Sequence, residues 1–177
     1  GGAGTRSSGN REYVEYFDLD RDGWLEASEI AQVKEMDSGW RSIASLKGIE
    51  HFTALENLYC SGNQLTTLDV NKNTALTKLY CGENQLTTLN LSENTALTEL
   101  YCASNQLTTL NLSKNTTLTF FNCYNNYLTY IDLSNNTALT TLDCSYNQLT
   151  ALDLSKNTKL TELSHSSQRP NAIRSTR

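Results

Sequence analysis

The stretch LENLYCSGNQLTTLDVNKNTA, residues 55–75, recurs along this 177-residue chain with a period of 21 residues. Further copies begin at residues 76, 97, 118 and 139, and a sixth copy begins at 160 but loses the pattern after His165. A unit this short cannot bury its own apolar side, so neighbouring copies must stack and share one core. The sequence therefore predicts a solenoid built from coils of this length.

Alternation of apolar and polar residues predicts a short strand in each copy. In the first copy, Leu58 and Cys60 alternate with more polar neighbours, which is the period of a half-buried strand. Stacking brings the strands of successive copies into a parallel sheet with a spacing of about 4.8 Å. We expect Leu65, Leu68 and Val70 to line the opposite wall of the coil.

An asparagine follows each predicted strand, at the ninth position of the copy. Its side-chain amide can satisfy backbone groups in the turn and in the next coil, which a buried turn requires. We therefore expect a structural ladder. Its members are Asn63, Asn84, Asn105, Asn126 and Asn147.

The five cysteines share one inward position, and three interpretations compete for them. Metal ligands would need to converge, whereas a straight ladder offers each thiol only neighbours along one line. Disulfides would leave one cysteine over, and parallel side-chain vectors do not meet. Packing as small hydrophobes in a core column is the favoured interpretation. The residues are Cys60, Cys81, Cys102, Cys123 and Cys144, and His165 takes the same position as a polar end to the core.

The shared pattern L-x-x-L-x-C-x-x-N-x-L-T-x-L-D-L-S-x-N-T matches the leucine-rich-repeat consensus. Roughly residues 40–165 resemble bacterial leucine-rich-repeat proteins of the internalin and BspA-like kind. We expect a leucine-rich-repeat solenoid with a parallel β-sheet spine of about six coils and a mostly irregular convex side. The resemblance further implies a non-catalytic, secreted or cell-surface bacterial module that binds its partner on the concave face.

The two ends of the array differ in their expected caps. Ile43, Leu46, Ile49 and Phe52 resemble half a repeat and open the array. Residues 12–17 and 28–36 carry helical apolar spacing and predict a small α-helical, EF-hand-like cap. No cap is evident on the C-terminal side, which favours truncation from a longer array. The expected division is residues 1–9 as linker or tag, 10–39 as cap, 40–167 as array and 168–177 as a non-native tail.

Residues 18–29, DLDRDGWLEASE, fit the EF-hand pattern D-x-D-x-D-G-x5-E without departure. Carboxylates, one backbone carbonyl and a bidentate glutamate would surround Ca²⁺, and a glycine permits the sharp turn. The alternative is an acidic turn that only resembles such a loop. A single loop of this kind favours a structural staple over a sensor. The expected ligands are Asp18, Asp20, Asp22, Trp24 through its carbonyl, Glu26 directly or through water, and Glu29.

Aromatic residues cluster at positions expected to face outward from the sheet. Exposed aromatics make good contact anchors because they bury much area for few frozen rotors. Cross-strand tyrosines also stabilise sheets without any ligand, so pure packing stays open as an alternative. The candidate ligand-binding residues are Tyr59, Tyr80, Tyr101, Phe120, Tyr124, Tyr127, Tyr146, Glu99 and Asp143.

Composition argues against several other functions. The formal net charge of −5 opposes binding to nucleic acid or to an anionic membrane. No run approaches the roughly 18 apolar residues that membrane insertion needs. The only histidines, His51 and His165, lie at opposite ends of the array, and no glycine-rich phosphate loop is present. An aspartate column at Asp69, Asp132 and Asp153 fits capping of backbone amides better than an acid pair. We expect no enzyme activity.

Three functions remain for a chain of this kind. The leading hypothesis is recognition of a protein ligand on the concave face, by a monomer. Carbohydrate recognition is the second, since tyrosine platforms with acidic rims also suit sugar rings. A spacer without ligand is the third.

Overall fold

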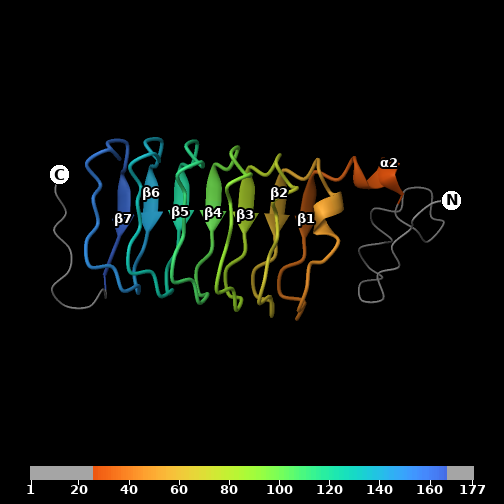
Figure 1. Ribbon diagram of the computed structural model, residues 1–177, viewed down its shortest axis with the longest axis horizontal. Coiled ribbons are helices and arrows are strands. Elements are labelled where there is room, and N and C mark those ends of the chain that lie inside the picture. Colours follow the sequence, from red (N-terminus) through yellow and green to blue (C-terminus); the bar gives the residue numbers. More distant parts are fainter. Residues whose placement is uncertain (1–25, 167–177) are drawn as a thin grey trace.

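The computed structural model describes residues 26–166, which form a row of stacked coils (Figure 1). Each coil contributes one three-residue strand, and the seven strands form one parallel sheet in chain order. A short helix, α2 (Ala27–Ile30), precedes the sheet, and the 3-10 helix η1 (Ile49–His51) lies between its first two strands. The strands are β1 (Glu35–Asp37), β2 (Asn57–Tyr59), β3 (Lys78–Tyr80), β4 (Glu99–Tyr101), β5 (Phe120–Asn122), β6 (Thr141–Asp143) and β7 (Glu162–Ser164).

Equivalent positions of successive copies pair in the sheet, as the 21-residue period predicts. Leu58 pairs with Leu79, and Leu79 with Leu100. The central residue of each strand from β2 to β6 is buried, while its two neighbours are half-buried. Turns and extended backbone complete each coil. The predicted parallel solenoid is confirmed.

One continuous apolar core runs the length of the coils. Leu65 and Val70 are fully buried and Leu68 nearly so, which confirms the opposite wall. Phe121 takes the place of a core leucine and is also fully buried. At the N-terminal side Ile49 is buried, and Ile43, Leu46 and Phe52 pack partly buried against the same core. All five cysteines are buried thiols in one column, as predicted.

The expected helix over residues 28–36 is wrong in its second half. α2 ends at Ile30, and Met36 lies in β1, where it pairs with Leu58 and is buried. Val33 reaches the core from the segment between the turn at residues 31–32 and β1, and Met36 reaches it from β1. Their spacing of three residues is also that of one face of a helix. Backbone pairing decides the outcome, because the carbonyl of Lys34 accepts N–H bonds from the first residues of the next coil. The other expected helix, residues 12–17, lies outside the described residues.

The asparagine ladder is confirmed, with one change in direction. Asn84 Nδ2 donates to the carbonyls of Cys81, at 3.1 Å, and of Cys60 in the preceding coil, at 3.0 Å. Its Oδ1 accepts the N–H of Leu65, also in the preceding coil, at 3.0 Å. The side chain of Asn84 therefore joins its own coil to the preceding coil by hydrogen bonds. The sequence analysis expected these bonds to reach the following coil.

A second asparagine ladder escaped the sequence analysis, although the residue recurs near the end of every copy. Asn115 Nδ2 donates to the carbonyl of Leu91 at 3.1 Å and to that of Asn94 at 2.9 Å, both in the preceding coil. These asparagines are almost completely buried, so the coils are clipped together on two walls. The members are Asn73, Asn94, Asn115, Asn136 and Asn157.

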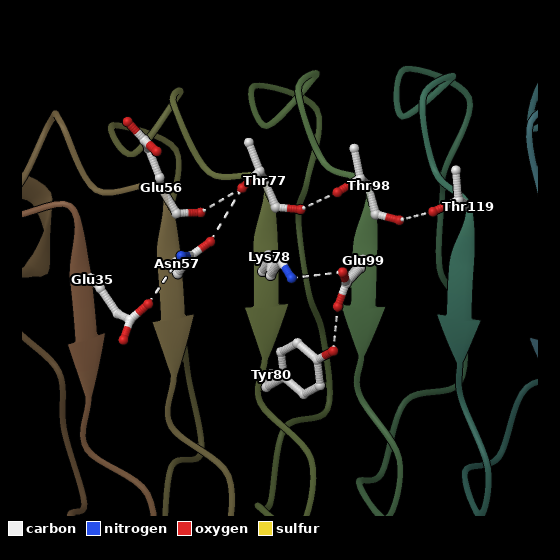
Figure 2. A network of polar contacts seen from close by, with 9 residues as sticks. All are labelled: Glu35, Glu56, Asn57, Thr77, Lys78, Tyr80, Thr98, Glu99 and Thr119. Carbon is white, nitrogen blue, oxygen red and sulfur yellow. Dashed lines mark hydrogen bonds and ion pairs between the residues drawn. The ribbon is translucent and has the colours of Figure 1, made fainter.

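Threonines just before the strands add a third set of clips, part of which Figure 2 shows. The hydroxyl of Thr77 donates to the carbonyl of Glu56 at 3.1 Å, and Thr98 donates to Thr77 at 3.1 Å. Thr119 continues the series with a bond of 3.0 Å to Thr98. Each coil thus bonds to its neighbour through side chains as well as through the strand ladder.

Candidate functional site

The side chains that point away from the core of β1–β7 form a continuous surface, which we call the outer face. It is the sheet surface that the sequence analysis expected to be concave. The first and third residues of each strand belong to it, because side chains alternate between the two sides of a strand. Among these residues are six of the nine predicted ligand-binding residues, and the turns that follow β5 and β6 hold the other three, Tyr124, Tyr127 and Tyr146.

Three tyrosines form a column along the outer face. The ring centroids of Tyr59 and Tyr80 are 5.2 Å apart with an interplanar angle of 38°. The rings of Tyr80 and Tyr101 are stacked, at 5.9 Å and 17°. All three side chains are half-buried. Contacts between these rings therefore stabilise the sheet without any ligand. This agrees with the alternative interpretation, in which the tyrosines serve packing alone.

A polar network fixes the middle of this column (Figure 2). Lys78 Nζ lies 2.8 Å from Glu99 Oε1, and the hydroxyl of Tyr80 donates to Glu99 Oε2. These two hydrogen bonds lower the pKa of the Glu99 carboxyl. Burial, and then the hydrogen bond to Glu99, raise the pKa of Tyr80. The charge of Glu99 is therefore compensated inside the protein.

Gly82 sets the position of the last ring in the column. A Cβ atom at this residue would lie 2.1 Å from Cε1 of Tyr101 and 2.7 Å from Cδ1. No other residue type leaves room for the ring in this place. The side chain of Tyr101 therefore leans back over the preceding coil, toward Tyr80.

The fourth coil carries a second group of aromatics. The rings of Tyr124 and Tyr146 contact one another at 5.1 Å with an interplanar angle of 57°. Tyr127, Tyr130 and Tyr146 have exposed fractions of 51%, 66% and 49%. Phe120 is half-buried on β5. The predicted aromatic patch is thus two groups, the tyrosine column and the exposed aromatics of the fourth and fifth coils.

Trp40 is an exposed aromatic that the sequence analysis missed. Its exposed fraction is 71%, and its backbone is left-handed with φ 57°. The indole lies against Gly62, where a Cβ atom would come within 2.3 Å of the ring. The sequence did contain a signal for this contact. Trp40 comes one repeat before Gly62, and a glycine at that position leaves room for a large side chain from the coil before.

Only two of the six predicted calcium ligands fall within the described residues. Glu26 is exposed, whereas Glu29 is buried in α2 and its Oε2 accepts the N–H of Glu26 at 3.0 Å. Asp18, Asp20, Asp22 and Trp24 lie outside that part of the chain. Among residues 26–166, no three His, Cys, Asp or Glu side chains are grouped so that they could hold a metal ion.

The aspartate column caps backbone amides, as predicted. Asp69 Oδ1 accepts the N–H of Asn71 at 3.0 Å, and Asp132 Oδ1 accepts that of Ser134 at 2.9 Å. Asp153 does the same for Ser155 at 2.8 Å. Hydrogen bonds from Ser134 and Ser155 lower the pKa of Asp132 and Asp153 respectively.

The stacked coils, their asparagine ladders and their single core define a leucine-rich-repeat solenoid. An internalin (inlF) from Listeria monocytogenes has a similar structure, with a TM-score of 0.66 and 24% identity over 88% of this chain and 53% of that one. The leucine-rich repeat domain of APL1B gives 0.71 and 21%, over 84% and 48% of the two chains. The protein LIC12759 from Leptospira interrogans gives 0.65 and 24%, over 84% and 47%.

This chain spans about half the length of each of these structures. No protein-family model matches the sequence. No curated protein matches it either. In the part of the chain from residue 26 to 166, no helix is long and apolar enough to cross a membrane.

Proposed function

We propose that the outer face and the adjoining turns bind a protein ligand, in a non-catalytic module of a bacterial secreted or surface protein. The observation that carries this proposal is the exposure of Tyr127, Tyr130 and Tyr146, which the core does not need. Exposed aromatic side chains are enriched in protein interfaces and supply much of their binding energy. Structural likeness to an internalin supports the class of function, although a fold alone does not determine it.

Carbohydrate recognition is the second candidate. Sugar rings pack against the flat faces of aromatic rings, and the faces that Tyr80 and Tyr101 turn toward each other are already stacked. A glycan would therefore depend on the aromatics of the fourth and fifth coils. This arrangement supports a protein ligand more than a glycan.

A fourfold alanine variant tests the proposal. We expect replacement of Tyr124, Tyr127, Tyr130 and Tyr146 by alanine to lower binding to host surface proteins by more than tenfold, because several anchors are lost together. Alanine at the exposed threonines Thr66, Thr87, Thr108 and Thr129, outside the sheet, is the matched control. Binding is measured in a protein pull-down and on a glycan array. Binding of the unaltered protein only on the glycan array, with loss in the variant, supports the second candidate. Unchanged behaviour of both variants supports a spacer.

We also propose that Ca²⁺ binds residues 18–29 and staples the N-terminal cap. Five acidic side chains so close in sequence repel one another without a cation, which would couple folding of the cap to the metal. Glu29 is buried, and its carboxylate accepts the N–H of Glu26. A side chain held in this way suits the last ligand of the loop, because its position is fixed before the metal binds.

Removal of calcium is expected to lower the melting temperature, and titration calorimetry should show one site per chain. Asp20→Asn should weaken binding more than tenfold, whereas Glu93→Gln, an exposed carboxylate in the array, should leave it unchanged. Unchanged melting after chelation, together with no heat of binding, would contradict the proposal.

A further inference from the structure

The tyrosine column of the outer face ends abruptly at Tyr101. The next two residues in the same row of the sheet are Asn122 and Asp143, whose side chains are much shorter. Tyr101 leans back over Gly82 and stacks on Tyr80. Among residues 26–166 no aromatic ring contacts Tyr101 from the side of Asn122. On that side the last ring of the column is not stacked on another ring.

Two further aromatic side chains flank these short residues. Phe120 precedes Asn122 by two positions in β5 and projects on the same side of the strand, and Tyr124 lies in the turn that follows the strand. Both are half-buried. Tyr124 is held in place by its contact with Tyr146. Asn122 thus has aromatic residues at three neighbouring positions, Tyr101 in the paired strand and Phe120 and Tyr124 in its own segment of the chain.

Negative charge lies at the same place. Asp143 Oδ1 accepts the N–H of Ser145 at 3.0 Å, and within the described residues the carboxylate has no Lys or Arg partner. Burial raises the pKa of Tyr101, and the nearby carboxylates of Glu83 and Asp143 raise it further. Glu99, in contrast, is compensated by Lys78.

The outer face as a whole is acidic. Its strand positions carry one basic side chain, Lys78, which is already paired with Glu99. The acidic side chains at these positions are Glu35, Asp37, Glu99, Asp143 and Glu162. A partner that approaches this face gains Coulomb energy only if it is basic.

We propose that a Lys or Arg side chain from an extended basic segment of the protein partner binds against Tyr101, Phe120 and Tyr124, with its charge on Asp143. The aromatic faces attract a cation and cover its aliphatic stem, and the carboxylate supplies the ion pair. An anionic or neutral group gains neither the attraction to the aromatic faces nor the ion pair. This inference rests on the proposed protein-binding function and names the chemistry of the partner.

A peptide titration tests this cation site. The probe is an acetylated penta-arginine amide, added to the full chain and followed by NMR at 20 and 150 mM NaCl. We expect the amide signals of Tyr101, Asn122, Tyr124 and Asp143 to shift, with weaker binding at the higher salt concentration. Penta-citrulline, which has nearly the same shape without charge, should not shift them.

Asp143→Asn should weaken binding of penta-arginine about tenfold, whereas Glu162→Gln, with the same change of charge on the same face, should weaken it less than twofold. Asn fits position 143, because Asn122 Oδ1 makes the equivalent bond to the N–H of Tyr124 at 2.9 Å in the coil before. Equal weakening by both variants, or no shift at all, would overturn the cation site. If the fourfold alanine variant still loses a protein ligand in that case, the protein-binding function stands and only the cation site fails.

Discussion

Between pH 9 and pH 10 the free energy of unfolding is expected to fall by about 6 kcal/mol, since five thiols that ionise near pH 8.5 in the unfolded chain each contribute about 1.2 kcal/mol over this interval. Burial raises the pKa of Cys81 and of Cys144 to about 12 in the folded state. It also holds the pKa of the other three thiols well above their usual value. Each thiol therefore contributes stability that is complete below about pH 8.5, the unfolded value, and is lost as the pH rises toward the folded value.

Urea unfolding at several pH values, with a phosphine reductant present, measures this slope. Cys102→Ala removes one of the five titrating groups, so we expect the slope to fall by about one fifth. The cavity that this variant creates lowers stability equally at every pH and leaves the slope unaffected. Tyrosine ionises mainly above pH 10, outside the chosen window. A wild-type slope near zero, or an unchanged slope in Cys102→Ala, would refute the explanation.

Asn105→Ala is expected to cost about 2–6 kcal/mol of stability. It leaves the buried N–H of Leu86 without a partner, at about 1–3 kcal/mol, and removes one of the two asparagine hydrogen bonds to each of two buried carbonyls, at about 0.5–1.5 kcal/mol each. Asn105 Nδ2 donates to the carbonyls of Cys81 and Cys102 at 3.0 and 3.1 Å. Its Oδ1 accepts the N–H of Leu86 at 3.0 Å. The variant therefore loosens the clip between two coils in the middle of the array.

The adjacent residue offers a matched control. Gln106 is exposed, so Gln106→Ala should change the free energy of unfolding by less than about 0.5 kcal/mol. Both variants are compared by urea unfolding at pH 7. A cost below about 1 kcal/mol for Asn105→Ala would show that water replaces the ladder without penalty.

The solenoid could be predicted from the sequence because its period is local and repeated. The inward positions of Leu58 and Cys60 follow from alternation alone, and the odd number of cysteines already argued against a disulfide framework. The capping role of Asp69 was predictable for the same reason, because it depends on residues two positions away.

Features that depend on neighbouring coils were harder to predict. Met36 has the spacing of a helix, but its pairing with Leu58, 22 positions later, places it in a strand. The stacking of Tyr101 over Gly82 depends on a contact 19 positions apart, which no local pattern reveals. The aromatic patch was therefore predicted as one group of residues, and the structure divides it into two.

The clips between coils also determine how the protein responds to a pulling force. Within residues 26–166, almost every bond of a coil reaches only the coil before or after it, and β1 and β7 each pair on one side only. Tension applied along this stack would therefore release coils one at a time from the loaded end. Each released coil of 21 residues adds roughly 70 Å of slack. A ligand bound near β4 and β5 would thus be held through a tether that lengthens in steps before the binding surface itself is disturbed.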